Sequence, residues 1–321
     1  MFLGWDNPLK IVALAGGVGG AKLAEGLSKY LEHGQLTVIV NTGDDLDLFG
    51  LHISPDLDTV CYTLAGLANP TTGWGQKEET WEVFRTLSKI GSPDWFRLGD
   101  HDLAIHLERT RLLAEGMTLT EVTQRLCSKL GVTNQVLPMS DQTVHTMVHT
   151  RDNRRLSFQE YFVKEQCQPV VTRFEFDGIE KANPSINGIS AIQECDLVVF
   201  CPSNPWVSID PILNLGNIRE IIKQKRIVAV SPIIGGKTLK GPAAKMFEEL
   251  GIQPSAAAVA EHYRDILTGF ILDTIDRSSV ELIRGWGIIP LVTETIMRSM
   301  EDRMQLAKET INFGLSLPLK G

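Results

Sequence analysis

The feature that most constrains the fold of this chain is an apolar strand that runs directly into a glycine-rich turn. Residues 11–15 read Ile-Val-Ala-Leu-Ala, and four of the five residues from Gly16 to Gly20 are glycine. From Ala21 onward, apolar residues recur at helical spacing. Glycine lets the backbone pass close to a ligand, and the first turn of a helix offers unpaired N–H groups to an anion. The stretch therefore predicts a phosphate-binding turn between a buried strand and a helix.

Two familiar phosphate-binding motifs do not match this turn. A P-loop needs a hydroxyl after its lysine to hold magnesium, but Lys22 is followed by Leu23. A dinucleotide-binding turn needs a third glycine where Lys22 stands, and an acidic residue at the end of the next strand, where the chain has Asn41. A tight turn without a ligand is the alternative. We expect phosphate to be bound by Gly16, Gly17, Gly19, Gly20 and Lys22.

Apolar runs alternate with helical patterns through most of the chain, which predicts a Rossmann-like, doubly wound α/β fold with a mostly parallel sheet. Further strands are expected at residues 36–40, 196–201, 226–230 and 288–292, and helices from Ser54 and over 184–194, 213–223, 242–250 and 294–313. Between them, residues 77–90, 102–115 and 118–130 have helical spacing, and residues 144–174 look like irregular strands. We therefore expect a nucleotide-binding core at residues 9–70 and 131–321, with a helical insertion at 71–130.

Small, polar or glycine-rich segments follow four of the predicted strands. In open α/β sheets, ligands bind outside the carboxyl ends of the strands, so these segments should face one crevice. They are residues 16–20, 41–45, 203–204 and 231–237. The donors expected to bind phosphate or a nucleotide base are Ser203, Asn204, Ser231, Gly235, Gly236 and Lys237, whereas Lys240 is interpreted as a surface charge.

Four aspartates lie close together in the sequence, at a predicted strand end and a predicted helix start. They are Asp44, Asp45, Asp56 and Asp58. Carboxylate oxygens shared with phosphates are the usual ligands of Mg²⁺, so the pattern predicts a magnesium site. The alternative is structural: the first two acids form a turn, and the last two complement the dipole of a helix that Ser54 caps.

Composition excludes some partners. The formal net charge is −8, with 31 Lys and Arg against 39 Asp and Glu, so nucleic acid is a poor candidate. No run approaches the ~18 apolar residues of a membrane span, and Met1–Asp6 contain no basic region, so we expect a cytoplasmic protein.

The five cysteines form no Cys-x-x-Cys pair and are interpreted as reduced core thiols. Asp102 and His106 are interpreted as a surface contact rather than a metal site.

Taken together and in order, the motifs resemble those of the 2-phospho-L-lactate transferase family over roughly residues 10–245. The matching stretches are Ala15–Leu23, Asn41–Asp45, Ser54–Thr59, Trp74-Gly75, Leu98–Asp100 with Asp102-Leu-Ala, Leu137–Asp141, Ser203–Pro205, Ser231–Lys237 and Gly241–Ala243. The chain departs from the family in having His101 where many members have lysine or arginine, and Gln142 where a second acid is common.

The resemblance implies an enzyme of coenzyme F-420 biosynthesis that requires Mg²⁺ and forms a homodimer. Such an enzyme transfers the phosphoryl-acid portion of a guanosine-diphosphate-activated three-carbon acid to the ribityl hydroxyl of 7,8-didemethyl-8-hydroxy-5-deazariboflavin, and GMP leaves. By the same resemblance, Asp56 and His101 contact the deazaflavin, and the insertion at 71–130 covers this acceptor.

Combining the motifs with the resemblance, we expect Asp44, Asp45 and Asp56 to hold Mg²⁺ on the diphosphate, with Asp45 or Asp56 as the candidate general base. The rival hypothesis is a non-catalytic, nucleotide-sugar-binding regulator of the gluconeogenesis-factor type. That family continues its acidic strand end into a Gly-Gly-Ser-Ser-Gly run, whereas Asp45 is followed by Leu46-Asp-Leu-Phe-Gly50. This difference favours the transferase. The sequence does not distinguish a phospholactate, phosphoenolpyruvate or phosphoglycerate type of donor.

Overall fold

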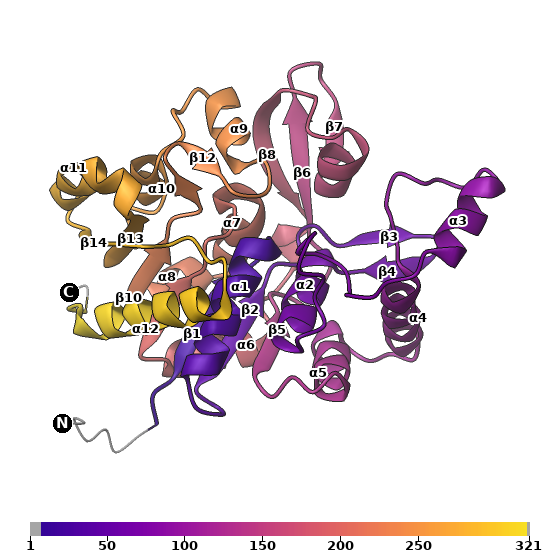
Figure 1. Cartoon of the computed structure of the whole chain (residues 1–321), viewed down its shortest axis with the longest axis horizontal. Coiled ribbons are helices and arrows are strands. Elements are labelled where there is room, and N and C mark those ends of the chain that lie inside the picture. The colour runs from indigo at the N-terminus through magenta and orange to yellow at the C-terminus, as the bar shows by residue number, and fades with distance from the viewer. Residues whose placement is uncertain (1–7, 320–321) are drawn as a thin grey trace.

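The computed structural model of the chain describes residues 8–319 and has a seven-stranded parallel sheet at its centre (Figure 1). The strand order is β14-β13-β10-β9-β1-β2-β5, and every neighbouring pair is parallel. The strands are β1 (Ile11–Ala15), β2 (Leu36–Val40), β5 (Gln135–Pro138), β9 (Leu197–Phe200), β10 (Arg226–Val230), β13 (Gly269–Asp273) and β14 (Ile289–Thr293). The predicted doubly wound α/β fold is therefore confirmed.

Helices cover both faces of this sheet because its central strands are apolar on both sides. Alternate residues of β1 point to opposite cores: Val12 and Leu14 pack into one cluster, and Ile11 and Ala13 into the other. The second cluster includes residues of α1 (Gly17–Tyr30), α2 (Pro55–Leu64), α5 (Leu119–Lys129) and α12 (Met300–Ser316). The first includes residues of α6 (Ile186–Glu194), α7 (Asp210–Leu213), α8 (Ile218–Ile222), α9 (Ala243–Glu249), α10 (Ala256–His262) and α11 (Val280–Gly285).

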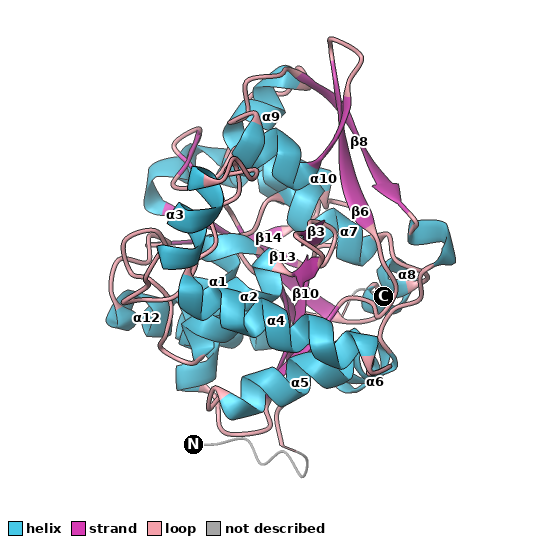
Figure 2. Ribbon diagram, turned by 90° about the vertical axis from the view of Figure 1, so that its right-hand side faces the viewer, coloured by secondary structure: helices cyan, strands magenta, loops and turns pink. Residues whose placement is uncertain are grey.

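The segment between α2 and β5 is helical and lies at one end of the molecule (Figures 1 and 2). It contains α3 (Glu82–Lys89), α4 (Asp100–Ala114) and α5. Thr118 and Glu121 form the capping box that starts α5, as the sequence pattern indicates. Figure 1 shows α3 at the outer end of this segment. A short hairpin of β3 (Leu46–Leu48) and β4 (Leu51–Ile53) packs against α4.

Several elements differ from the sequence-based expectation. Helix α1 starts at Gly17 rather than Ala21, and α12 starts at Met300, where Ser299 and Asp302 form a capping box. The hairpin β3–β4 and the buried strand β13 are additional elements. The region expected to hold irregular strands forms a separate antiparallel sheet of β6 (His145–Thr150), β7 (Arg155–Ser157) and β8 (Val171–Asp177). A second hairpin, β11 (Ile233–Ile234) with β12 (Lys237–Thr238), follows β10.

The expectation of five reduced cysteines is wrong for one pair. Cys61 on α2 and Cys127 on α5 form a disulfide, because both residues belong to the same hydrophobic cluster on one face of the sheet and their Cα atoms lie 6.0 Å apart. Their 66-residue separation in sequence concealed this proximity. Cys167, Cys195 and Cys201 are free, as expected.

Within residues 8–319, no helix is both long enough and apolar enough to span a membrane. The N-terminal stretch Met1–Asp6, used above to argue against a targeting signal, lies outside the described residues.

Candidate active site

The four loops expected to share a crevice leave the same edge of the sheet. Strands β10, β9, β1 and β2 are consecutive neighbours and parallel, so their carboxyl ends lie together. The glycine-rich turn follows β1, the segment Asn41–Asp45 follows β2, Ser203 follows β9 and Ser231 follows β10. Helix α2 begins in the same region, because the N–H of Gly17 donates to Asp56 Oδ1 at 2.6 Å.

The glycine-rich turn is packed tightly against its neighbours. A Cβ atom on Gly16 would lie 2.5 Å from Asp56 Oδ2 and 2.7 Å from Ser208 Cβ, and one on Gly19 would lie 2.4 Å from the carbonyl oxygen of Pro202. Gly17 has a φ of +63°, a conformation that favours glycine. The glycines are therefore needed for close packing of the turn against α2 and the segment after β9.

Three buried carboxylates lie beside this turn. Asp44, Asp45 and Asp56 each expose only 6% of their surface. The side-chain amide of Asn41 joins two of them, because Nδ2 donates to Asp44 Oδ1 and to Asp56 Oδ2, both at 2.9 Å. Gln159, which follows β7 in the smaller sheet, donates to Asp44 Oδ2 at 3.0 Å. The structure thus brings together the acids that the sequence predicts as magnesium ligands.

Asp45 is held through one oxygen only. Ser54 Oγ donates to Asp45 Oδ2 at 2.8 Å, and His52 Nε2 lies 3.2 Å from the same oxygen. Asp45 Oδ1 is buried and has no hydrogen-bond partner among the described residues. Ser54 occupies the N-cap position of α2 as expected, but its side chain makes no capping hydrogen bond. Its hydroxyl instead orients Asp45.

Burial makes these acids difficult to ionise. It raises the pKa of Asp44 well above its ordinary value, and the charges of Asp56 and Asp45 add to that effect. It also raises the pKa of Asp56 to about 6, although hydrogen bonds from Asn41 and Gly17 oppose the increase. For Asp45, burial raises the pKa against the hydrogen bond and charge of His52. Three adjacent buried acids of this kind either bind protons or require a positive charge beside them when they ionise.

The donor set fits a hard divalent cation such as Mg²⁺. Its oxygens come from three carboxylates, and Asp45 supplies a buried oxygen without a partner. Oxygen ligands of this type, shared with phosphates, are what Mg²⁺ prefers. The glycine-rich turn beside Asp56 provides the place where a diphosphate would meet such an ion.

Cation binding at this site should depend on pH in a defined direction. The raised pKa of Asp56 means that the folded, metal-free protein favours the protonated acid. The stability that this contributes is fully present below the ordinary pKa of 3.8 and is lost as the pH rises through about 6. Mg²⁺ needs ionised carboxylates. We therefore expect Mg²⁺ to raise the melting temperature markedly above about pH 7 and only slightly near pH 5. Differential scanning fluorimetry with EDTA-treated protein checks this.

The Asp56→Asn variant is the control for that experiment, because asparagine does not ionise. Its response to Mg²⁺ should be weak throughout the pH range. An equal Mg²⁺-induced shift at both pH values in the wild type would contradict the assignment of the ion to these acids.

Two of the predicted hydroxyl donors, Ser203 and Ser231, are engaged by backbone groups of the protein. Ser203 Oγ accepts from the N–H of Gly16 at 3.0 Å and donates to the Gly16 carbonyl at 2.8 Å. Ser231 Oγ bonds the backbone of Ile233 in the same way. These hydroxyls therefore shape the loops, and ligand contacts through them stay predictions.

Three further predicted donors, Asn204, Gly235 and Lys22, also have protein partners. Asn204 caps the π-helical turn Pro205–Ile209, and the N–H of Gly235 donates to both oxygens of Asp276, at 3.2 and 3.0 Å. Lys22 Nζ donates to the carbonyl of Met297 at 3.1 Å. Burial lowers the pKa of Lys22, assisted by the charges of Arg303 and Lys240. Gly236 adopts a φ of +75° in the β11–β12 hairpin, and Lys237 is exposed.

The interpretation of Lys240 as a plain surface charge is incomplete. Its side chain is exposed, but Nζ donates to the carbonyls of Thr71 and Thr72, at 3.3 and 2.6 Å. The contact links the segment after β12 to the start of the helical insertion.

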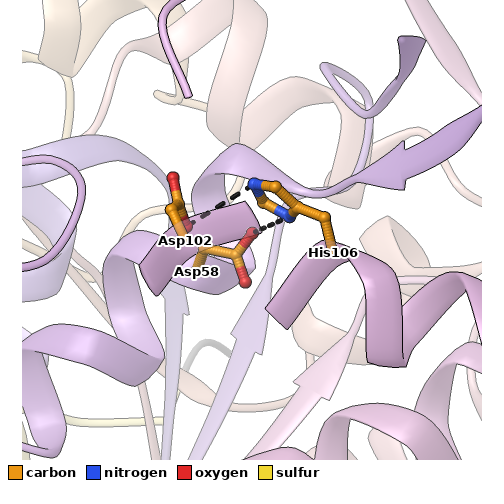
Figure 3. Close-up of side chains that lie close together, drawn as sticks. All are labelled: Asp58, Asp102 and His106. Carbon is orange, nitrogen blue, oxygen red and sulfur yellow. Dashed lines mark ion pairs between the residues drawn. The ribbon is translucent and has the colours of Figure 1, made fainter. Parts of the chain in front are cut away.

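A second acidic cluster lies between α2 and α4. Figure 3 shows Asp58, Asp102 and His106 pointing toward one another, with His106 Nδ1 3.6 Å from Asp58 and Nε2 3.5 Å from Asp102. The expected contact between Asp102 and His106 is present, but its expected place at the surface is wrong, because α4 packs against α2 and leaves His106 only 1% exposed. Tyr62 also donates to Asp102, at 2.6 Å.

This second cluster is already neutralised by the protein. Arg109 pairs with both oxygens of Asp58, and its Nη1 lies 3.1 Å from His106 Nδ1. Because guanidinium can only donate, His106 Nδ1 must accept, and its Nε2–H then faces Asp102. The adjacent positive charge disfavours a metal ion here, although the three ligand groups lie within 4.8 Å of one another. We interpret the cluster as a structural tie between the two helices.

The predicted deazaflavin contact His101 lies in the first turn of α4. Its N–H donates to Glu79 Oε1 at 2.6 Å, and its ring is half exposed beside the same carboxylate. A small cavity separates the start of α4 from the preceding loop. Its lining includes Asn69, Thr72, Trp74, Glu79, Trp81 and Asp102.

Sequence reasoning missed several residues around the acidic site. Ser54 was interpreted only as a cap, and Asn41 only as the residue that replaces an acid. His52 and Gln159 were not singled out, although His52 stands two residues before Ser54. Gln159 gave no local signal, because 115 residues separate it from its partner Asp44. The hydroxyl-bearing Ser208 reaches Gly16 only through the tertiary fold.

Comparison with known proteins gives consistent results. The family model described as 2-phospho-L-lactate transferase CofD matches residues 11–284. A phosphoenolpyruvate transferase of Thermobifida fusca is 43% identical over 285 residues, covering 85% of this chain and 88% of its own. A phosphoenolpyruvate transferase of Streptomyces coelicolor is 39% identical over 310 residues, covering 94% of this chain and 97% of its own. A 2-phospho-L-lactate transferase of Methanocaldococcus jannaschii is 37% identical over 310 residues, with coverages of 96% and 99%.

Among solved structures, a UPF0052 family protein from Bacillus halodurans has the same fold. The TM-score is 0.64, and the match covers 95% of this chain and 99% of the other. Sequence identity is 15%, so this similarity concerns the fold alone.

Proposed function

The chain belongs to the 2-phospho-L-lactate transferase CofD family and is therefore a transferase enzyme, and we propose a specific donor and acceptor for it. The donor is a guanosine-diphosphate-activated three-carbon acid, such as lactyl-2-diphospho-5'-guanosine or its enolpyruvyl analogue. The acceptor is the ribityl hydroxyl of 7,8-didemethyl-8-hydroxy-5-deazariboflavin, which places the enzyme in coenzyme F-420 biosynthesis. The observation that carries the proposal is the buried carboxylate cluster in contact with the glycine-rich turn through Asp56.

In the proposed reaction, the ribityl oxygen forms a bond to the phosphorus that carries the acid. The bond from that phosphorus to the bridging oxygen breaks, GMP leaves with the bridging electrons, and the hydroxyl proton is released. Such a transfer needs positioning and charge neutralisation more than covalent chemistry from the protein. The donor's diphosphate lies along the glycine-rich turn, where the first turn of α1 favours an anion.

The protein's carboxylates have two tasks in this scheme. Asp44, Asp45 and Asp56 would hold Mg²⁺, which when bound neutralises the diphosphate charge. Asp56 is also the candidate general base for the ribityl hydroxyl, because the N–H of Gly17 holds its carboxylate against the glycine-rich turn where the donor is proposed to lie. Asn41 links Asp44 and Asp56 by donating to both, and the N–H of Gly17 orients Asp56 through its other oxygen.

The helical insertion at 71–130 is proposed to cover the deazaflavin. Support comes from the side chains of Trp74 and Trp81, which lie beside the start of α4 and which a flat ring could contact. His101 in the first turn of α4 is the proposed second acceptor contact, beside Glu79. We further propose a cytoplasmic homodimer; light scattering on the purified protein would determine the oligomeric state.

One assay tests the proposed reaction. Purified protein is incubated with Mg²⁺, the deazaflavin and each candidate donor in turn: the lactyl, enolpyruvyl and glyceryl forms. We expect GMP and the corresponding phosphodiester by mass spectrometry with at least one donor, and neither product when the deazaflavin is omitted. Because relatives named for phosphoenolpyruvate and for 2-phospho-L-lactate are both similar to the chain, the donor arms decide between them.

Absence of product with every donor would overturn the proposed reaction. A nucleotide-sugar-binding regulator would then become the better hypothesis, and binding of nucleotide sugars by calorimetry would be the next measurement.

A further inference from the structure

The hairpin β3–β4 contacts one oxygen of the Asp45 carboxylate. His52 on β4 places Nε2 3.2 Å from Asp45 Oδ2, the oxygen that also accepts from Ser54 at 2.8 Å. The other oxygen, Oδ1, is buried and lacks a hydrogen-bond partner among residues 8–319. The two contacts therefore divide the carboxylate into an engaged oxygen and a free one.

The backbone of His52 is itself fixed by α4. Its N–H donates to Thr110 Oγ1 at 2.8 Å, and its carbonyl accepts from Arg109 Nη1 at 3.5 Å. The Thr110 hydroxyl donates in turn to the carbonyl of His106 at 2.7 Å. Since Arg109 also pairs with Asp58 on α2, the position of the imidazole is set by the packing of α4 on α2. A short hairpin that would be mobile alone is thus held at both backbone groups.

The outer side of the ring contributes little to this arrangement. His52 Nδ1 lies 3.5 Å from Asp47 Oδ1, but the Asp47 side chain is 81% exposed. Contacts between exposed charged groups are weakened by solvent and by the entropy of the side chains. The contact of His52 that can orient a buried carboxylate is therefore the one between its Nε2 and Asp45 Oδ2.

We propose that His52 is a positioning residue for Asp45, turning Oδ1 toward a divalent cation by engaging Oδ2. The inference rests on the proposed function, because it takes Asp45 as a cation ligand. It assigns a role to the hairpin β3–β4, which has no other evident part in the reaction. It also explains how the helical insertion influences the acidic site: α4 fixes the position of the His52 ring, and His52 fixes the orientation of the Asp45 carboxylate. Partners that orient a ligating side chain commonly change metal affinity by roughly 10- to 100-fold when they are removed.

Two substitutions at His52 distinguish the effect of losing its hydrogen bond to Asp45 from the effect of losing side-chain volume. In His52→Gln the side-chain amide nitrogen can take the place of Nε2, whereas in His52→Asn it takes the place of Nδ1 and falls short of Asp45. The matched control is His33→Gln, at an exposed position before β2 and at the opposite end of that strand from Asp45.

The primary readout is Mn²⁺ binding to the substrate-free protein, measured by electron paramagnetic resonance. We expect His52→Asn to weaken Mn²⁺ binding at least about 10-fold, His52→Gln to stay within about 3-fold of the wild type, and His33→Gln to be unchanged. In the transferase assay, His52→Asn should raise the Mg²⁺ concentration needed for half-maximal rate. Its KM for the deazaflavin should stay the same. Circular dichroism and melting temperature establish that each variant is folded.

Unaltered Mn²⁺ affinity in folded His52→Asn would overturn the proposal. Equal losses in the glutamine and asparagine variants would also overturn it, because they would indicate a packing role, as would failure of the wild type to bind Mn²⁺. If the wild type binds Mn²⁺ in a His52-dependent way but turns over no donor, this inference stands and the proposed reaction fails.

Discussion

Replacing Asp45 with asparagine is expected to lower turnover by roughly 100- to 1,000-fold while leaving the fold intact. Among residues 8–319, Asp45 Oδ1 is a buried carboxylate oxygen without a hydrogen-bond partner, so it is available to a cation. Asparagine can still accept from Ser54 through its carbonyl, but it places an N–H group where the free oxygen stood. Removing a buried charge with a raised pKa does not destabilise the fold by itself. The measurement is kcat at saturating Mg²⁺, with Mn²⁺ affinity as a second readout.

The matched control is Asp152→Asn. Asp152 lies in the exposed turn between β6 and β7 and pairs with Arg154 at the surface, so its loss should leave kcat within about twofold. Asp56→Asn should also reduce turnover strongly, since it removes the candidate base. Normal turnover in both Asp45→Asn and Asp56→Asn, each shown to be folded, would refute the assignment of the acidic cluster to catalysis.

Replacing Arg109 with methionine is expected to destabilise the protein by about 3–5 kcal/mol, the usual cost of removing one partner from a buried ion pair. Arg109 and Asp58 are both buried, and the guanidinium engages both oxygens of the carboxylate. Without it, Asp58 would remain charged between α2 and α4, or would have to take up a proton. Denaturant unfolding followed by circular dichroism measures the change in free energy.

Arg111→Met is the control for this prediction, because Arg111 lies on the same helix but forms only exposed pairs with Glu108 and Glu115. Its free energy of unfolding should change by no more than about 0.5 kcal/mol. Adding Asp58→Asn to Arg109→Met should recover part of the loss, since the unpaired charge is removed. Similar destabilisation in the two single arginine variants would contradict the structural role of the buried pair.

The parts of the fold that could be predicted are those with a strong local pattern. The segment 11–15 is apolar enough to be a fully buried strand, and Pro55 with two acids in the next turn starts α2 as expected. The strands of the hairpin β3–β4 are only three residues long, too short for a periodic signal. The buried strand β13 was missed, although its residues Phe270, Ile271 and Leu272 form a short apolar run. Such a run does not distinguish a buried strand from a helix by periodicity alone.

In the candidate site, too, some features could be predicted from the local sequence and others could not. The clustering of Asp44, Asp45 and Asp56 was predicted because these acids follow a strand end and start a helix at the same edge of the sheet. The roles of Ser203 and Ser231 were not readable, because whether a hydroxyl faces a ligand or its own loop depends on the orientation of the side chain. Asp102 and His106 resembled an exposed helical pair until the packing of α4 on α2 buried them.

The sequence alone determined the alternation of strands and helices in the core, the glycine-rich turn and the acids at the strand ends, because these depend on neighbours within a few residues. The tertiary structure decided which groups are free to act. Burial raises the pKa of Asp56 to about 6, and contacts from a hairpin and the N-cap of α2 leave Asp45 Oδ1 as an oxygen without a partner. Arg109 neutralises one acidic cluster and not the other. Desolvation and pairing arise from segments distant in sequence, so only the folded chain distinguishes a cation site from a structural tie.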